Sequence, residues 1–280
     1  MNKSSKKTKL LIVGSNSLIG NSFLKWTKFK GTIITCSKKD NLHTKLKKKP
    51  HVILNLAGEQ RNHDKMWSSN LIIVKKLIDH AIKNNCYLIQ TGSSSEYGIH
   101  TKPTKESNLL LPSNIYSGTK AAATMIVSGY AKGENLNAII VRPYCIYGHY
   151  SKKNRLIPLI IENIFKEKEM IIYDGNQDYL YVKDYVRAMD ILIQKRKLWK
   201  KGEIINVGSG KQYSNFEVVK TIEKVFKKQL NYRAVKRFNK PTDAKVWRSG
   251  SNLLKNKYKF VHKYNLLKGI IDLKKNLNID

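Results

Sequence analysis

Short apolar runs alternate with longer amphipathic segments through the first half of the chain. The runs are continuous and rich in β-branched residues, which is typical of strands buried on both faces of a parallel sheet. They cover residues 10–13, 32–35, 52–57, 87–91 and 138–141. Between the third and fourth runs, residues 70–84 carry apolar side chains at helical spacing. This alternation predicts βαβ units and therefore an α/β fold with a doubly wound parallel sheet.

The pattern becomes less regular after Gly148. We expect helices over residues 157–168, 185–195 and 215–227, a short apolar segment over residues 178–182 and a strand over residues 204–207. These elements predict a smaller C-terminal α+β part. The expected division is a sheet domain over residues 1–150 and a smaller substrate-binding part over residues 151–280, partly interleaved with the first. A pocket between the two is the expected site.

The charge balance is strongly basic. The chain has 280 residues, of which 53 are Lys or Arg and 20 are Asp or Glu, so its formal net charge is +33 at pH 7. A hydrophobic content of 41% excludes a wholly disordered protein. Lysines are scattered along the whole length, which favours solvated surface charge and no specific nucleic-acid partner. A polyanion-binding protein, with RNA as its partner, remains the alternative.

Cysteine, histidine and hydropathy patterns exclude several classes of site. The three cysteines have no paired spacing and the seven histidines form no ligand motif, so we expect no disulfide and no metal. The basic start imitates a signal peptide, but the apolar run that follows is too short, and we interpret it as a strand. No window reaches the roughly 20 apolar residues of a membrane span. We expect a cytoplasmic protein that does not insert into membranes.

A loop of small residues follows the first predicted strand and opens a helix. It consists of Gly14, Ser15, Asn16, Ser17, Leu18, Ile19 and Gly20. Such a loop suits the pyrophosphate of a dinucleotide, because the backbone can approach closely and the helix N-terminus attracts phosphate. It predicts a Rossmann-like nucleotide-binding sheet. Ser17 stands where a middle glycine is expected, so a plain strand–turn–helix connection remains possible.

The end of the second predicted strand bears on the choice of cofactor. An NAD-binding sheet usually places an acidic residue there, about 20 residues beyond the glycine loop, to bind the ribose. Here the strand is followed by Ser37, Lys38 and Lys39. A hydroxyl and two ammonium groups suit a 2′-phosphate, which favours NADP(H) over NAD(H). Ordinary surface lysines are the alternative interpretation.

Two further motifs carry proton-transfer chemistry. Tyr116 and Lys120 are four residues apart and share a helix face, so the ammonium can stabilise the ionised phenol and make the tyrosine a usable acid or base. Ser93 lies at the end of a predicted buried strand, where its hydroxyl can bind the same substrate oxygen. Their order along the chain, after the glycine loop, is more specific than any one of them.

At this point the sequence resembles the extended short-chain dehydrogenase/reductases, the epimerases and dehydratases of nucleotide sugars. The resemblance covers nearly the whole chain and rests on the glycine loop, residues 55–58, residues 93–98, Tyr116 with Lys120, residues 142–148, residues 178–184 and residues 206–210. It implies an NAD(P)-dependent oxidoreductase, a homodimer and a role in surface-polysaccharide precursor synthesis.

The resemblance also implies roles for individual residues. Tyr116 would be the acid/base, Lys120 would bind the nicotinamide ribose and tune Tyr116, and Ser93 would hold the reacting oxygen. Leu56, Ala57 and Gly58 would line the cofactor path, and Tyr144 would lie near the nicotinamide. Residues expected to face a nucleotide-sugar substrate are Ser94, Ser95, Cys145 and Arg248.

Departures from the family pattern narrow the expected activity. The 4,6-dehydratases carry acidic residues after the Ser or Thr, but here Ser94 and Ser95 stand in those places. The 3,5-epimerase/reductases that make GDP-fucose carry a cysteine in this strand, and this strand has none. We therefore expect reduction of the C4 keto group of a nucleotide-activated 6-deoxy sugar, with a nucleotide-sugar 4-epimerase as the alternative.

Two departures concern the substrate. Cys145 replaces the usual Asn after the Arg-Pro-aromatic motif, and the arginine expected to bind the diphosphate is missing near Asp178. Another cation must take that role if the substrate is a full nucleotide sugar. The candidates are Arg233, Arg237 and Arg248.

Overall fold

The computed structural model describes residues 7–236 and 246–277. Its centre is a six-stranded sheet, with all strands parallel in the order β2-β1-β3-β4-β5-β10. The strands are β1 (Lys9–Val13), β2 (Thr32–Cys36), β3 (Val52–Asn55), β4 (Tyr87–Thr91), β5 (Ala138–Pro143) and β10 (Glu203–Val207). The predicted α/β class with a doubly wound parallel sheet is confirmed, and the first five strands match the predicted runs to within two residues.

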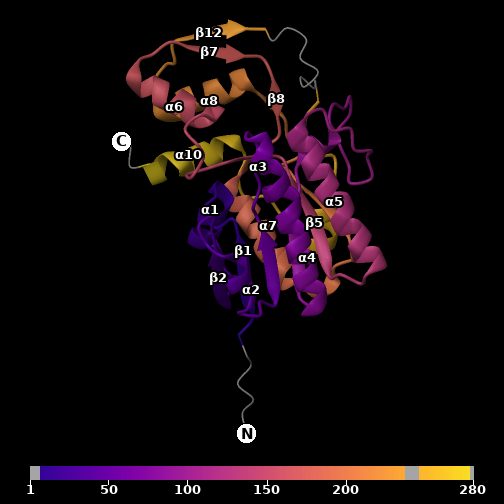
Figure 1. Ribbon diagram of the computed structural model, residues 1–280. Coiled ribbons are helices and arrows are strands. Elements are labelled where there is room, and N and C mark those ends of the chain that lie inside the picture. The colour runs from indigo at the N-terminus through magenta and orange to yellow at the C-terminus, as the bar shows by residue number, and fades with distance from the viewer. Residues whose placement is uncertain (1–6, 237–245, 278–280) are drawn as a thin grey trace.

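Helices cover both faces of the sheet (Figure 1). One face packs against α1 (Leu18–Trp26), α7 (Val182–Gln194) and α9 (Leu253–Tyr258). The other packs against α2 (Leu42–Leu46), α4 (Ile73–Lys83) and α5 (Ile115–Gly133). Because both faces are covered, the strands are apolar along their length; Leu10, Leu11 and Ile12 have no exposed surface.

The order of strands reverses between β1 and β3, since the chain moves outward from β1 to β2 and returns on the other side of β1. The carboxyl ends of strands beside such a reversal form a crevice where ligands bind in open α/β sheets. The glycine loop follows β1 and residues 56–58 follow β3, whereas Ser37 and Lys38 follow β2, the next strand along the sheet.

The segment predicted as a helix over residues 70–84 begins earlier and is interrupted. It consists of α3 (His63–Trp67), a π-helical turn over Ser68–Ile72 and α4. A π turn inserts an extra residue per turn and is found frequently at functional sites. Here it brings the Asn70 side chain into the protein interior, where its exposed fraction is 1%.

A smaller part lies beyond one end of the sheet (Figure 1). It contains α6 (Leu156–Lys166), α8 (Asn215–Phe226), α10 (Leu266–Leu277) and three strand pairs: β7 (Met170–Tyr173) with β12 (Tyr232–Val235), β8 (Asn176–Gln177) with β11 (Tyr213–Ser214), and β6 (Cys145–Tyr147) with β9 (Tyr179–Tyr181). Its apolar core is separate from the two cores on the sheet faces.

Strand β10 and helix α7 were predicted for the smaller part, but both are part of the domain built around the large sheet. Strand β10 pairs with β5, and α7 packs against the sheet. The expectation was wrong at these elements because it followed position along the chain, whereas the apolar side chains of β10 and α7 complete a core begun by β1, β3, β4 and β5. The boundary at residue 150 stays a prediction; α7, β10 and α9 are elements beyond it that pack with the large sheet.

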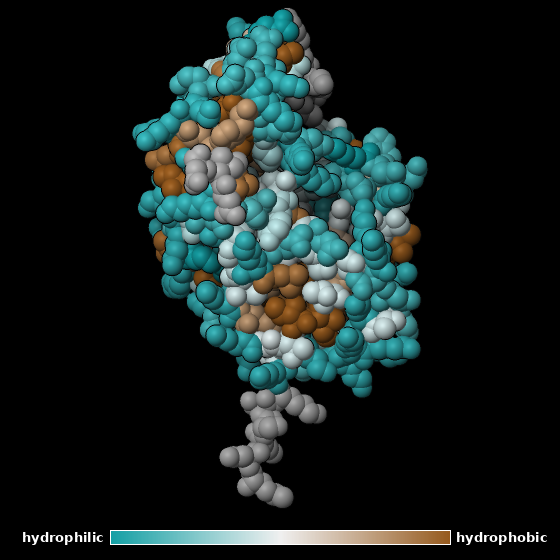
Figure 2. Space-filling view, turned by 90° about the vertical axis from the view of Figure 1, so that its left-hand side faces the viewer, coloured by the Kyte–Doolittle hydropathy of each residue, from teal (hydrophilic) through white to brown (hydrophobic). Residues whose placement is uncertain are grey.

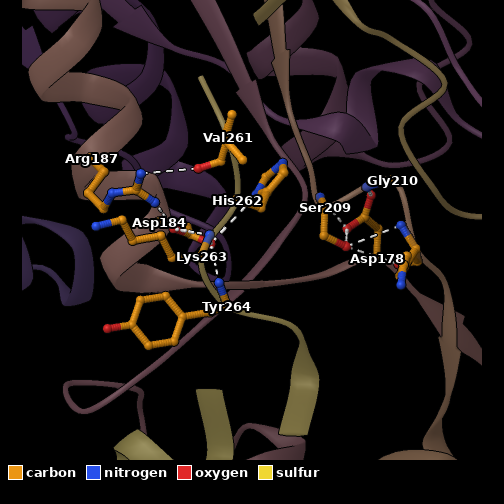
Figure 3. A network of polar contacts seen from close by, with 10 residues as sticks. Asp178, Asp184, Arg187, Ser209, Gly210, Val261, His262, Lys263 and Tyr264 are labelled. Carbon is orange, nitrogen blue, oxygen red and sulfur yellow. Dashed lines mark hydrogen bonds and ion pairs between the residues drawn. The ribbon is translucent and has the colours of Figure 1, made fainter. Parts of the chain in front are cut away.

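Two buried carboxylates, those of Asp178 and Asp184, bind backbone groups of loops that are distant in sequence (Figure 3). Asp184, at the start of α7, accepts hydrogen bonds from the backbone N–H groups of Lys263 and Tyr264 at 3.0 and 2.9 Å and from Arg187. Asp178 accepts hydrogen bonds from Ser209, Gly210 and Ser249. Each carboxylate thereby ties distant loops to the β9–α7 region.

The surface is predominantly polar. Most of the face drawn in Figure 2 is hydrophilic, with hydrophobic areas separated from one another. None of the helices within residues 7–236 and 246–277 is long and apolar enough to cross a membrane.

Replacing Asp184 by Asn should lower the free energy of unfolding by about 2–4 kcal/mol at pH 7, because several donors then face a neutral amide in a buried position. Burial opposes ionisation of Asp184, but the His262 ring, 3.6 Å away, and hydrogen bonds from Tyr264, Lys263 and Arg187 lower its pKa in the folded protein. Its charged form therefore contributes stability above the ordinary Asp pKa of about 3.9, and this contribution is lost as the pH falls below that value.

Urea unfolding of the two proteins between pH 7 and pH 2 measures this difference, which should stay constant down to about pH 4.5 and narrow below about pH 4. The matched control is Asp79→Asn, because Asp79 is an exposed partner of Lys75 on α4. That change should alter stability by less than about 1 kcal/mol. A difference for Asp184→Asn that widens toward acid pH would contradict the lowered pKa of Asp184.

Candidate active site

The glycine loop lies where backbone atoms of β1 and β3 approach most closely. Gly14 has φ +83°, and a Cβ there would lie 2.8 Å from the backbone nitrogen of Ala57. A Cβ on Gly20 would lie 2.4 Å from the carbonyl oxygen of Ser15. Both positions therefore need glycine, one for the left-handed turn and both for backbone packing.

Ser17, which replaces the expected middle glycine, has a local role. Its hydroxyl accepts a hydrogen bond from the Gly20 N–H at 3.0 Å and caps the N-terminus of α1. Ser15 is buried, Asn16 is exposed, and Leu18 and Ile19 are partly exposed. A tight turn with close backbone approach at a helix N-terminus fits the phosphates of a dinucleotide.

The end of β2, where the sequence analysis expected only a hydroxyl and cations, also carries the carboxylate of Asp40. The Ser37 hydroxyl and backbone N–H both donate to Asp40 at 2.7 Å, and Lys45 forms an ion pair with the same carboxylate. These hydrogen bonds, that of Lys45 above all, hold the pKa of Asp40 well below its ordinary value. Asp40 is the acidic residue that the sequence analysis missed, because it follows the strand by four residues and only the turn brings it back to Ser37.

Lys38 is likewise paired with an acid. Its ammonium lies 3.2 Å from the carboxylate of Glu59, which follows β3. Burial opposes ionisation of Glu59, but hydrogen bonds from the backbone of Arg61 and Gln60, with that from Lys38, lower its pKa to about 2. Ser37 and Lys38 are therefore both engaged with carboxylates.

The loop after β3 is fixed by two buried asparagines. Asn55 accepts a hydrogen bond from the Ala57 N–H and donates to Gln90 of β4. Asn70, from the π turn, accepts from the Glu59 N–H and donates to the Glu59 carbonyl and to Thr119 of α5. Leu56, Ala57 and Gly58 are thereby held beside the glycine loop and α5.

Lys120 is buried beside the same loop. Its exposed fraction is 3%, and its ammonium donates to the carbonyl oxygen of Thr91 at the end of β4 at 2.9 Å. A Cβ on Gly58 would lie 3.1 Å from this ammonium. Helix α5 therefore places Lys120 between the loop after β3 and the end of β4.

Tyr116, one turn earlier on α5, is partly exposed. Its hydroxyl accepts a hydrogen bond from the side-chain amide of Gln60 at 3.2 Å. Arg155, just before α6, donates to the carbonyl of the same Gln60 side chain. A chain of two hydrogen bonds therefore connects Tyr116 to the smaller part, through two residues that no sequence motif had indicated.

Ser93 caps the short 3₁₀ turn Ser94–Tyr97 that follows β4. Its hydroxyl accepts hydrogen bonds from the Ser95 N–H at 3.1 Å and the Ser95 hydroxyl at 2.8 Å. The turn packs against α5, the helix that carries Tyr116 and Lys120. The ends of β3 and β4 and the first turns of α5 thus bring the three predicted catalytic residues into one region.

A second group surrounds a cavity of about 10 Å³. It contains Ser94, Tyr144 and Arg248, together with Tyr97, Gly98, Thr104, Val246 and Trp247. The hydroxyls of Tyr144 and Thr104 are hydrogen-bonded, and burial raises the pKa of Tyr144. Ser94 and Arg248, which were predicted to bind the substrate, thus lie around the same cavity as Tyr144, which was predicted to lie near the nicotinamide.

The other predicted substrate and anion-binding residues lie apart from that cavity. Cys145 is in β6, where burial raises its pKa to about 11 and the charge of Arg155 acts against that rise. Arg233 is exposed on β12, and Arg237 lies outside the described residues. No group of three or more His, Cys, Asp or Glu side chains within residues 7–236 and 246–277 is arranged to hold a metal ion.

The sequence matches the model of the NAD dependent epimerase/dehydratase family over residues 7–208. The low-salt glycan biosynthesis protein Agl12 of Haloferax volcanii is 29% identical over 182 residues, 61% of this chain and 58% of that protein. The dTDP-glucose 4,6-dehydratase of Haemophilus influenzae is 38% identical over 114 residues, 40% of this chain and 33% of that enzyme. The chain thus spans less than two thirds of these relatives.

Solved structures share the fold over nearly the whole chain. The dTDP-glucose 4,6-dehydratase of Bacillus anthracis in complex with NAD has a TM-score of 0.84 and 23% identity, covering 97% of both chains. UDP-glucuronic acid 4-epimerase of Bacillus cereus, with NAD, has a TM-score of 0.84 and 18% identity over 96% of this chain and 100% of that one. RMD of Pseudomonas aeruginosa, with NADPH, has a TM-score of 0.84 and 16% identity over 96% and 98%.

The close packing at Gly20 predicts that Gly20→Ala lowers the free energy of unfolding by about 1–3 kcal/mol, because the added methyl group meets backbone atoms that cannot rotate away. Thermal and urea unfolding measure this change.

Gly129→Ala on α5 is the matched control, because a Cβ there meets nothing within 4 Å. It should raise stability by about 0.5–1 kcal/mol, since alanine favours a helix interior. Equal stability changes for the two variants would contradict the packing described for the glycine loop.

Proposed function

The chain belongs to the NAD-dependent epimerase/dehydratase family, and from this we propose that it is an oxidoreductase acting on C4 of a nucleotide-activated sugar, with reduction of a 4-keto-6-deoxy sugar as the favoured reaction. Tyr116, Lys120 and Ser93 are the proposed catalytic residues. The bound dinucleotide would supply or accept the hydride.

The observation that carries this proposal is the set of groups around Ser93. Its hydroxyl is hydrogen-bonded to the Ser95 hydroxyl, and Ser94 faces the small cavity with Tyr144 and Arg248. A dehydratase needs an acid and a base at these positions in addition to the tyrosine, whereas hydride transfer at C4 needs only one proton donor. Serine at both positions therefore favours simple oxidation–reduction.

The proposed proton path runs through Tyr116. Its partly exposed hydroxyl would donate a proton to the oxygen that forms at C4, and Ser93 would hold the same oxygen by a hydrogen bond. The buried ammonium of Lys120, held by the Thr91 carbonyl, would stabilise the ionised tyrosine that remains. Gln60 would have to release the Tyr116 hydroxyl before substrate oxygen can take its place.

The groups at the end of β2 favour NAD(H) as the cofactor, in place of the NADP(H) expected from Ser37 and Lys38. A 2′-phosphate there would face the carboxylates of Asp40 and Glu59, and the two predicted partners already bind those carboxylates. A free 2′-hydroxyl, by contrast, can donate to a carboxylate. The glycine loop, residues 56–58, Tyr116 and Lys120 would hold the remainder of the cofactor.

A nucleotide-sugar 4-epimerase is the second candidate, and the same carboxylates favour it. An epimerase reoxidises its own intermediate and keeps its NAD, so a site suited to NAD fits both reactions. In either case Arg155 and Arg248 are the proposed partners of the substrate's phosphates. A homodimer stays a prediction.

Tyr116→Phe should lower turnover by at least about 100-fold, because the phenol proton is lost while the ring is kept. Turnover is followed as oxidation of NADH or NADPH with dTDP-4-keto-6-deoxyglucose as the probe. Tyr130→Phe, on the same helix, is the matched control and should retain activity. Binding of the dinucleotide, followed by fluorescence titration, should be unchanged in both variants. Full turnover by Tyr116→Phe would rule out the proposed role.

The cofactor assignment predicts that the protein binds NADH more tightly than NADPH. Asp40→Asn should weaken NADH binding about tenfold and reduce the preference, because the amide no longer repels a 2′-phosphate. Asp79→Asn, on the outer surface of α4, should change neither dissociation constant. Tighter binding of NADPH by the unaltered protein would contradict the assignment. NAD retained through purification, with interconversion of C4 epimers and no need for added reductant, would identify the epimerase.

A further inference from the structure

The carboxylate of Glu96 is buried and is bound to the backbone of the proposed catalytic serine, Ser93. Glu96 has no exposed surface, and its Oε1 accepts a hydrogen bond from the Ser93 backbone N–H at 2.7 Å. Its Oε2 accepts hydrogen bonds from the Thr124 hydroxyl and the Arg142 Nε, each at 2.8 Å. Three donors from different parts of the chain therefore converge on one carboxylate.

These donors belong to three structural elements. Ser93 begins the turn after β4, Thr124 lies on α5 one turn beyond Lys120, and Arg142 lies on β5. Gly92 makes room for the arrangement, because a Cβ there would lie 2.3 Å from Oε1 of Glu96. Glu96 therefore connects the turn that carries Ser93 to the helix that carries Tyr116.

The arrangement is poorly explained by stability alone. A buried ion pair recovers in attraction roughly what its desolvation costs, and apolar replacements are often at least as stable. Here one nitrogen of Arg142, Nη1, is buried without a hydrogen-bond partner, which adds to the cost. Burial raises the pKa of Glu96, and the ion pair with Arg142 and the other donors act against that rise.

The hydroxyl of Ser93 is oriented by the same turn. It accepts two hydrogen bonds, from the Ser95 N–H and the Ser95 hydroxyl, which occupy both of its acceptor positions. Its own proton is then the group left to offer to a ligand. A serine held in this way donates to a substrate oxygen, and the position of that donor depends on how firmly the Ser93 backbone is held.

We propose that Glu96 is a positioning residue that sets the place of the Ser93 hydroxyl relative to Tyr116 on α5. It acts through the Ser93 backbone N–H on one side and through Thr124 on the other, with Arg142 balancing its charge. This inference rests on the proposed function of Ser93 and Tyr116 and deepens it. Glu96 itself does not touch the substrate.

Glu96→Gln is the most informative substitution because it keeps the size of the side chain. Glutamine offers one acceptor oxygen and one NH₂ donor where three donors converge. If its oxygen faces Thr124 and the cation of Arg142, its NH₂ group opposes the Ser93 N–H, so Ser93 must move. We expect kcat to fall about 10–100-fold, with KM and the dissociation constant of NADH changed less than threefold.

Glu203→Gln is the matched control. Glu203 is also partnered by a cation and a hydroxyl, from Lys257 and Tyr258, but it lies at the amino end of β10, away from the site. It should lower thermal stability and leave kcat unchanged. A proportional loss of kcat in both variants would overturn the proposal, because it would mean that Glu96 serves stability only.

A double-mutant cycle tests whether Glu96 acts through Ser93. In a Ser93→Ala background, where the hydroxyl is already absent, Glu96→Gln should reduce kcat less than threefold further. An equal reduction in both backgrounds would show independent action and overturn the proposal. On α5, Thr124→Val should lower kcat, because valine cannot donate a hydrogen bond to Glu96. Thr124→Ser keeps the hydroxyl and should retain the kcat of the unaltered protein.

Amide hydrogen exchange gives a readout that does not depend on any substrate. The Ser93 amide should exchange at least tenfold faster in Glu96→Gln, while the Gly92 amide, bonded to the Val141 carbonyl, stays protected. Unchanged exchange at Ser93 would overturn the positioning role.

Failure of the unaltered protein to turn over any 4-keto sugar would instead reject the proposed function, and the exchange result would still decide whether Glu96 holds Ser93.

Discussion

Parallel pairing of β1 with β3 sets the position of the glycine loop against the loop after β3. Val13 and Asn55 are paired at the carboxyl ends of the two strands. That register brings Gly14 against Leu56 and Ala57, where a side chain would not fit. The order in which the chain adds strands reverses between β1 and β3. Helix α1 begins at the carboxyl end of β1, so its N-terminus lies at the crevice formed there. The need for glycine at position 14 follows from this contact between backbones, whereas Gly20 and the Ser17 cap answer to contacts within the glycine loop itself.

Buried polar side chains then join this edge to α5. Asn70 links the loop after β3 to Thr119, Lys120 binds the carbonyl at the end of β4, and Glu96 links the following turn to Thr124. Helix α5 therefore makes polar contacts with the π turn, with the end of β4 and with the turn after β4, although the same helix is held to the sheet by apolar packing. Apolar contacts tolerate small shifts, whereas a hydrogen bond fixes distance and direction. The polar side of α5 is suited to fixing Tyr116 and Lys120.

The sequence was enough to predict the fold class, because the strands and helices of this sheet follow local patterns. Continuous apolar runs identified five of the six strands of the sheet, and the sixth was found but assigned to the smaller part. The Tyr116 and Lys120 spacing identified α5. Gln60, Arg155 and Asn70 could not be found in this way, since their roles arise from contacts between residues 49 to 95 positions apart. Asp40 was missed because its carboxylate reaches Ser37 only through the shape of a turn.

The distribution of charge adds an argument about Lys120. Among the described residues, the buried cationic side chains are Lys120 and Arg142, in a chain with 53 lysines and arginines. Arg142 has the carboxylate of Glu96 as its partner, whereas the Lys120 ammonium donates its hydrogen bond to a neutral carbonyl. A buried ammonium without a carboxylate is expensive, and the other lysines that the structure describes are at least partly exposed. A hydrogen-bond acceptor bound beside Lys120 would complete its environment, which explains the buried position of this side chain.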